Sequence, residues 1–122
     1  MKSCLIIDDS APSRGVAARL LSGFGLETSE AGTGEAALDI CKAQMPDSIL
    51  LDWYMPAMDG MEFLKNLREM SPDHLPTIIF CTAETSTRKI SEALSAGARG
   101  YVMKPFDRDI LRSTFRNLKL ID

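Results

Sequence analysis

Short apolar runs alternate five times with segments of helical periodicity along this chain of 122 residues. The apolar runs fall at residues 4–7, 49–51, 78–81 and 101–103, and a more polar run falls at residues 26–31. Continuous apolar character over a few residues is typical of parallel strands covered on both faces. The more polar run fits a strand at the edge of the same sheet.

Segments with apolar residues at helical spacing separate the expected strands. They lie around residues 16–21, 37–41, 64–67, 90–94 and 111–118. Gly25 and the proline-containing stretches at residues 46–47 and 71–72 are expected to end helices. Regular alternation of strand and helix predicts a doubly wound α/β domain, in which right-handed crossovers place helices on both faces of a parallel sheet.

Length, charge and hydropathy exclude several classes of protein. A chain of 122 residues, 45% of them hydrophobic, can bury a core but has room for one domain, expected over residues 1–122. A net charge of −3 gives no broad basic surface for nucleic acid or anionic membrane. The first apolar run is too short for a signal peptide or a membrane span. We therefore expect a cytoplasmic protein without a membrane segment.

Polar side chains stand at the ends of four of the five expected strands. Asp8 and Asp9 follow the first strand, Asp52 the third, Thr82 the fourth and Lys104 the fifth. Taken singly, each has a structural alternative: a helix cap for either first-strand aspartate, a loop hydrogen bond for the threonine, and solvation for the lysine. In open parallel sheets, however, ligands bind at the carboxyl ends of the strands. Their joint placement therefore favours a functional site.

The chemistry of these side chains suits phosphoryl transfer. Three carboxylates on one edge repel one another, so at least one should have a raised pKa unless a cation lies between them. Mg²⁺ suits such oxygen ligands, because it keeps several waters and takes one or two carboxylates plus a phosphate oxygen. Thr82 and Lys104 supply a hydroxyl donor and a fixed positive charge for the phosphoryl oxygens. Asp52 is then the candidate nucleophile, since a carboxylate can form an acyl phosphate.

Four stretches of the chain carry a resemblance to a known family. They are IIDDS at residues 6–10, LLDWYMPAMDG at residues 50–60, FCTAE at residues 80–84 and GYVMKPF at residues 100–106. In this order they resemble the receiver domain of two-component response regulators, specifically the single-domain, CheY-like kind. The resemblance extends from residue 2 to about residue 118. It implies a flavodoxin-like (βα)5 sandwich with a five-stranded parallel sheet in the order 2-1-3-4-5.

The resemblance implies a phosphoacceptor and a metal site. Asp52 is implied to receive the phosphoryl group from a sensor histidine kinase or a histidine phosphotransfer protein. The implied cofactor is Mg²⁺, for which Mn²⁺ can substitute. Its implied ligands are Asp9, Asp52 and the backbone carbonyl of Tyr54, while Asp8 holds a metal-bound water. Such a protein is not an enzyme acting on external substrates, because it catalyses only its own phosphorylation and dephosphorylation.

The resemblance also implies a phosphate clamp and a switch. Thr82, the backbone amide of Ala83 and Lys104 are implied to bind the phosphoryl oxygens. Tyr101 is implied to turn inward when Thr82 moves toward the phosphate. The peptide bond between Lys104 and Pro105 is expected to be cis, as it usually is in this family.

Residues beside the phosphoacceptor are expected to tune its chemistry. Tyr54 lies two residues after Asp52, and Glu84 lies two residues after Thr82. A bulky Tyr54 should shield the acyl phosphate more than the asparagine of the best-known chemotaxis member. Trp53, next to the phosphoacceptor, should report metal binding through its fluorescence.

The expected output is protein binding on the face built from residues around 90–94, 101–103 and 111–118. No DNA-binding domain is expected, and the protein should be a monomer, with a phosphorylation-dependent dimer as the alternative. Basic residues gather near this face: Arg108, Arg112, Arg116 and Lys119 in the last helix, with Arg88, Lys89 and Arg99 nearby. They suit an acidic partner or a nucleotide, although a solvated helix face is the simpler interpretation.

Two alternatives to a phosphoryl-accepting receiver stay open. A haloacid-dehalogenase-type phosphatase also uses an aspartate nucleophile with a threonine or serine and a lysine. Its nucleophile follows the first strand in an Asp-x-Asp pattern, whereas Asp8 and Asp9 are adjacent here and the lone acid follows the third strand. The other alternative is an adaptor with the receiver fold that works without phosphorylation.

Overall fold

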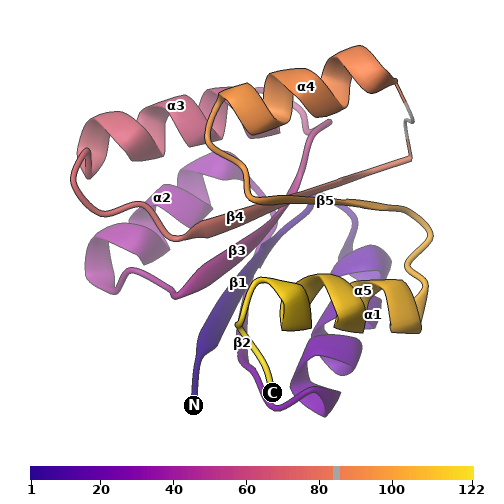
Figure 1. The fold of residues 1–122 in the computed structure, drawn as a ribbon. Helices are drawn as coiled ribbons and strands as arrows, with labels where there is room; N and C mark the ends of the chain where they lie inside the picture. The colour runs from indigo at the N-terminus through magenta and orange to yellow at the C-terminus, as the bar shows by residue number, and fades with distance from the viewer. Residues whose placement is uncertain (84–85) are drawn as a thin grey trace.

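Five strands and five helices alternate through the part of the chain that the structure, a computed structural model, describes: residues 1–83 and 86–122 (Figure 1). The strands are β1 (Ser3–Ile7), β2 (Glu27–Ala31), β3 (Ser48–Asp52), β4 (Thr77–Thr82) and β5 (Gly100–Met103). The helices are α1 (Ala11–Gly23), α2 (Gly34–Ala43), α3 (Gly60–Met70), α4 (Thr87–Ser95) and α5 (Arg108–Asn117). No helix among the described residues is long and apolar enough to span a membrane.

The strands form one parallel sheet in the order β2-β1-β3-β4-β5. This order confirms the predicted doubly wound fold and places the more polar strand, β2, at an edge. The winding direction reverses between β1 and β3, and ligand sites in such sheets lie outside the carboxyl ends of the strands at this point. The residues that follow β1 and β3 are therefore neighbours at the edge where a ligand site is expected.

Two layers of helices cover the sheet. Figure 1 shows α1 and α5 on one face and α2, α3 and α4 on the other. Leu5 and Ile7 of β1 belong to the core beneath the second layer, whereas Cys4 and Ile6 belong to the core beneath the first. Successive side chains of a strand point to opposite faces, so a strand between two helical layers must be apolar at every position. This geometry explains the uninterrupted apolar runs.

The side chain of the residue before each helix caps its first turn. The capping residues are Ser10, Thr33, Asp59, Ser86 and Asp107, and each accepts a hydrogen bond from the backbone amide three residues later. Ser10, not Asp8 or Asp9, caps α1. The structural alternative considered for these two aspartates is therefore wrong, and both carboxylates remain available to a site.

Candidate functional site

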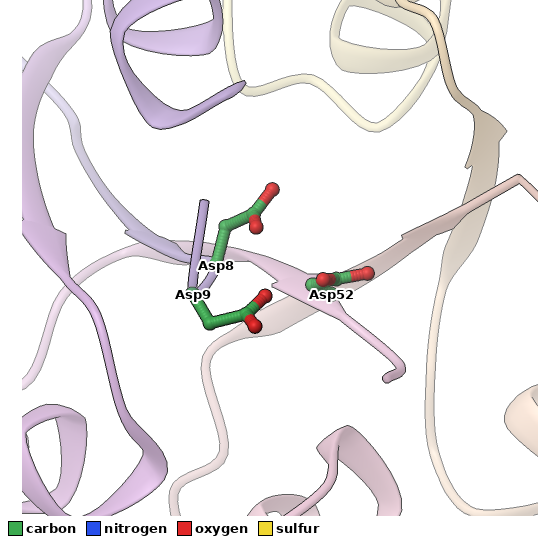
Figure 2. Close-up of side chains that lie close together, drawn as sticks. All are labelled: Asp8, Asp9 and Asp52. Carbon is green, nitrogen blue, oxygen red and sulfur yellow. The ribbon is translucent and has the colours of Figure 1, made fainter. Parts of the chain in front are cut away.

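Three carboxylates meet at the carboxyl edge of the sheet. Asp8 and Asp9 follow β1, and Asp52 is the last residue of β3 (Figure 2). One carboxylate oxygen from each lies within 4.8 Å of the other two. Asp8 and Asp52 are buried, whereas Asp9 is exposed. The cluster thus offers oxygen ligands from two buried acids and one acid open to solvent. This arrangement suits a hard divalent cation that keeps part of its water shell.

Lys104 joins this cluster from the segment after β5. Its Nζ lies 2.5 Å from Oδ2 of Asp8 and 3.4 Å from Oδ2 of Asp52. The alternative of a solvated lysine is therefore wrong, because the ammonium group bridges two of the acids. The peptide bond to Pro105 is cis, as expected.

Burial and charge set the two buried acids apart. The pKa of Asp52 is raised to about 6, chiefly by burial and also by the charges of Asp8 and Asp9, while Lys104 acts to lower it. Burial also acts to raise the pKa of Asp8, but hydrogen bonds from Lys104 and the amide of Ser10 lower it below its usual value. The raised pKa was predicted from carboxylate repulsion alone, yet burial is the larger cause. Asp8 is thus the firmly ionised partner of Lys104, and Asp52 is the acid whose charge lacks full compensation.

Thr82 and Tyr101 lie on neighbouring strands beside the cluster. Thr82 ends β4 and is buried, and its carbonyl accepts a hydrogen bond from the amide of Lys104. Tyr101 on β5 is half-buried and pairs in register with Phe80. Phe80 is two residues before Thr82, and side chains two residues apart in a strand share a face of the sheet. Thr82, Phe80 and Tyr101 therefore all lie on the face that α4 covers. Ala83 follows the strand and is exposed.

Two aromatic residues follow Asp52 with very different exposure. Trp53 is 3% exposed, and its ring centroid lies 5.0 Å from that of Phe80. Tyr54 is 49% exposed, so its side chain stands at the surface beside the phosphoacceptor candidate. Glu84, the other residue expected to tune the site, lies outside the described residues.

Arg14 of α1 is a supporting residue that the sequence analysis missed. Its Nη1 donates a hydrogen bond of 2.6 Å to the backbone carbonyl of Asp8, and its Nε donates one of 3.2 Å to Glu30 on β2. The guanidinium group therefore fixes the backbone from which the acidic pair projects. An arginine on a helix near two aspartates gives no distinctive pattern, so only the three-dimensional contact identifies it.

Gly60 is a second residue whose role the sequence analysis did not identify. A Cβ atom there would lie 2.5 Å from the carbonyl oxygen of Asp52 and 2.8 Å from Cε1 of Phe80. Its amide donates a hydrogen bond of 2.8 Å to the carbonyl of Trp53. The start of α3 therefore packs directly on the backbone of the phosphoacceptor candidate. Asp59 just before a helical segment was a usable signal for the helix start, since aspartate favours the N-cap position, but no sequence pattern marks the close contact at Gly60.

The basic residues expected near the output face are not one continuous stripe. Lys119 lies beyond the end of α5 with a φ of 62°, so it does not extend the row of arginines on that helix. Lys89 directs its ammonium group at the rings of Trp53 and Tyr54, 4.8 Å and 5.4 Å from their centroids. The stripe on α5 is thus shorter than predicted because the helix ends at Asn117, and the nearby Lys89 is engaged with two aromatic rings.

Comparisons with known proteins agree with this geometry. A model of the response regulator receiver domain matches residues 4–116. Chemotaxis protein CheY-3 of Vibrio cholerae is 39% identical over 110 residues, which cover 88% of this chain and 84% of the relative. Chemotaxis protein CheY of Pseudomonas aeruginosa is 35% identical over 116 residues, which cover 93% of each protein.

The solved structures include a close match in fold. Chemotaxis protein CheY4 of Vibrio cholerae, crystallised at low pH, has a TM-score of 0.87 and 33% sequence identity to this chain. The match covers 100% of this chain and 99% of that one. The strand order, the acidic cluster and a family match over most of the length lead to one conclusion: the chain belongs to the response regulator receiver family of two-component phosphorelay signalling and is a CheY-like member.

Proposed function

We propose that this chain is a phosphoryl-accepting receiver in which Asp52 takes the phosphoryl group from a histidine kinase or phosphotransfer protein. The observation that carries the proposal is the cluster of Asp8, Asp9 and Asp52 with Lys104 bridging two of them. The proposal treats residues 1–122 as a single receiver domain, which the continuous sheet of the described residues supports.

Mg²⁺ fits the donor set of this cluster. The residues proposed to hold it are Asp9, Asp52 and the backbone carbonyl of Tyr54, with Asp8 acting through a bound water. The exposed position of Asp9 leaves the site open to the water shell that Mg²⁺ retains. When bound, the metal would supply positive charge to the phosphoryl oxygens during transfer.

The proposed transfer uses an ionised Asp52. With its pKa raised to about 6, this carboxylate is mostly deprotonated at neutral pH and is a nucleophile. One of its oxygens forms a bond to phosphorus, the P–N bond of the phosphohistidine donor breaks, and the electron pair of that bond leaves with the imidazole nitrogen. The product is an acyl phosphate on Asp52. Hydrolysis by water then releases inorganic phosphate and restores the carboxylate.

The remaining residues of the site are proposed to detect the new group. Lys104, the hydroxyl of Thr82 and the amide of Ala83 would bind phosphoryl oxygens that exist only after modification. Such differential contacts are what shifts an equilibrium between two conformations. Thr82 and Tyr101 lie on the same face of adjacent strands, so movement of the threonine toward the phosphate would open space for the tyrosine ring. The α4-β5-α5 face is therefore the proposed surface for the downstream protein.

The relatives suggest which pathway to test first. Two of them are named chemotaxis proteins. We therefore propose a chemotaxis target as the first candidate partner for this face.

Incubation with phosphoramidate and Mg²⁺ tests the proposed function. Mass spectrometry of the intact protein should show one added phosphoryl group. This group should not form in Asp52→Asn, nor in wild-type protein to which EDTA is added in place of Mg²⁺. No labelling of the wild-type protein would favour the phosphorylation-independent adaptor. Repeated turnover of a general phosphate monoester would favour a phosphatase.

A further inference from the structure

A lysine from α4 lies over two aromatic rings beside Asp52. The Nζ atom of Lys89 is 4.8 Å from the ring centroid of Trp53 and 5.4 Å from that of Tyr54. The two ring centroids are 6.5 Å apart. Both lysine distances are within the range of about 6 Å over which a cation is attracted to an aromatic face. Lys89 therefore connects α4 with the segment that directly follows the phosphoacceptor candidate.

The two rings differ in how firmly the rest of the protein holds them. Trp53 is 3% exposed and packs on Phe80 in the core. Tyr54 is 49% exposed, so a large part of its side chain faces solvent. An attraction that spans both rings ties the exposed ring of Tyr54 to the buried ring of Trp53. The position of the Tyr54 ring is thus the property that Lys89 can influence most.

The backbone of Lys89 is held by the N-terminal cap of α4. Ser86 caps α4, and its hydroxyl accepts the hydrogen bond from the amide of Lys89. The neighbouring Arg88 points elsewhere, toward Glu92, and its side chain is 88% exposed. Of these two adjacent basic residues, Lys89 contacts the aromatic pair and Arg88 pairs with Glu92, so Arg88 serves as the control for loss of a positive charge from the same helix turn.

We propose that Lys89 is a positioning residue that holds Tyr54 beside Asp52 and so slows hydrolysis of the acyl phosphate. This inference rests on the proposed function, because it requires Asp52 to be phosphorylated. Hydrolysis needs a water molecule to reach phosphorus at a site where Asp52 is only 6% exposed. A tyrosine ring two residues along the chain can restrict that approach only while it keeps one position.

The test measures how fast the acyl phosphate decays. Wild type, Lys89→Met, Lys89→Arg and Arg88→Met are phosphorylated with phosphoramidate and Mg²⁺, the donor is removed, and phosphate release is followed. We expect Lys89→Met to decay about two- to fivefold faster, which corresponds to the strength of an exposed cation–π contact. Lys89→Arg should restore the slow rate, and Arg88→Met should match wild type. Trp53 emission of the unmodified protein should change in Lys89→Met but not in Arg88→Met.

A second background shows whether Lys89 acts through Tyr54. In Tyr54→Ala, which itself should decay faster, adding Lys89→Met should cause no further change. Equal decay of wild type and Lys89→Met, or an undiminished effect of Lys89→Met in Tyr54→Ala, would overturn the inference while the proposed function stands. Absence of wild-type labelling would overturn the proposed function, and the inference with it.

Discussion

Asp8 and Asp52 are neighbouring acids that the fold places in opposite electrostatic situations. Hydrogen bonds from Lys104 and from the amide of Ser10 hold the pKa of Asp8 below its usual value. Burial outweighs the lowering effect of Lys104 and raises the pKa of Asp52 to about 6. The negative charge of Asp52 is thus only partly offset by the positive charge of Lys104. Binding of a metal ion would supply further positive charge to this carboxylate.

This imbalance predicts that Asp52→Asn stabilises the metal-free protein at neutral pH. The unfolded carboxyl ionises near its usual pKa, whereas the folded one stays protonated until about pH 6. The stability that the neutral form contributes is therefore present at low pH and is lost as pH rises through about 6. We expect a gain of about 1–3 kcal/mol in the free energy of unfolding at about pH 7.5. Urea denaturation in EDTA measures it.

The same comparison at low pH supplies the control. Near pH 4 the gain should largely disappear, because the folded wild-type carboxyl is protonated there. Asp39→Asn removes an exposed carboxylate from α2 and should change stability little at either pH. An Asp52→Asn variant that is less stable than wild type at neutral pH would contradict this interpretation.

Trp53 should report metal binding at the cluster. Its indole is buried and directly follows Asp52, so a divalent charge at the carboxylates alters its surroundings without direct contact. Titration with Mg²⁺ should quench its emission, and Asp9→Asn should require a higher Mg²⁺ concentration for the same change. Asp39→Asn is the matched control. Unchanged emission at saturating Mg²⁺ would count against the assigned site.

At the scale of elements, the connection from β3 to α3 shapes the site. Asp52 ends the strand and Gly60 begins the helix, and the two are in backbone contact. Between them, Ala57 adopts a φ of 67°, and the amide of Met58 bonds to the carbonyl of Pro56. The connection therefore turns tightly enough to bring the helix back onto the end of its own strand.

This contact predicts opposite effects for two glycine-to-alanine changes. Gly60→Ala should lower the free energy of unfolding by about 2–3 kcal/mol, since the new methyl group collides with backbone that cannot easily move. Gly15→Ala in α1 meets no atom within 4 Å and should raise it by about 0.5–1 kcal/mol. Urea denaturation of both variants tests the pair. A Gly60→Ala variant as stable as wild type would show that the helix does not pack on the strand end.

At the scale of the whole molecule, the sequence predicted the architecture because two periodicities alternate along it. Runs that are apolar at every position mark strands between two helical layers, and the strand ends then place Asp8, Asp9, Asp52, Thr82 and Lys104 on one edge. Contacts that no local pattern encodes could not be predicted. Lys89 reaches Trp53 across elements that are distant in sequence, and Arg14 turns back from α1 to the carbonyl of Asp8 only six residues earlier without any distinctive spacing.

Competition between local signals explains the other differences. Either aspartate after β1 could have capped α1, but Ser10 stands at the position where its hydroxyl reaches the amide of Ser13. The basic spacing of α5 extended to Lys119 in sequence, yet the helix ends at Asn117. The spacing of side chains along a sequence therefore does not by itself determine where a helix stops.

Asp52, the acid at the end of β3, is the residue that we expect to become phosphorylated. Borohydride reduces an acyl phosphate but not a free carboxylate, so it converts a phosphorylated aspartate to homoserine. Protein treated with phosphoramidate and Mg²⁺, reduced and digested, should contain homoserine at position 52 by peptide mass spectrometry. Homoserine at another aspartate, or labelled protein with an unmodified residue 52, would contradict phosphorylation of Asp52.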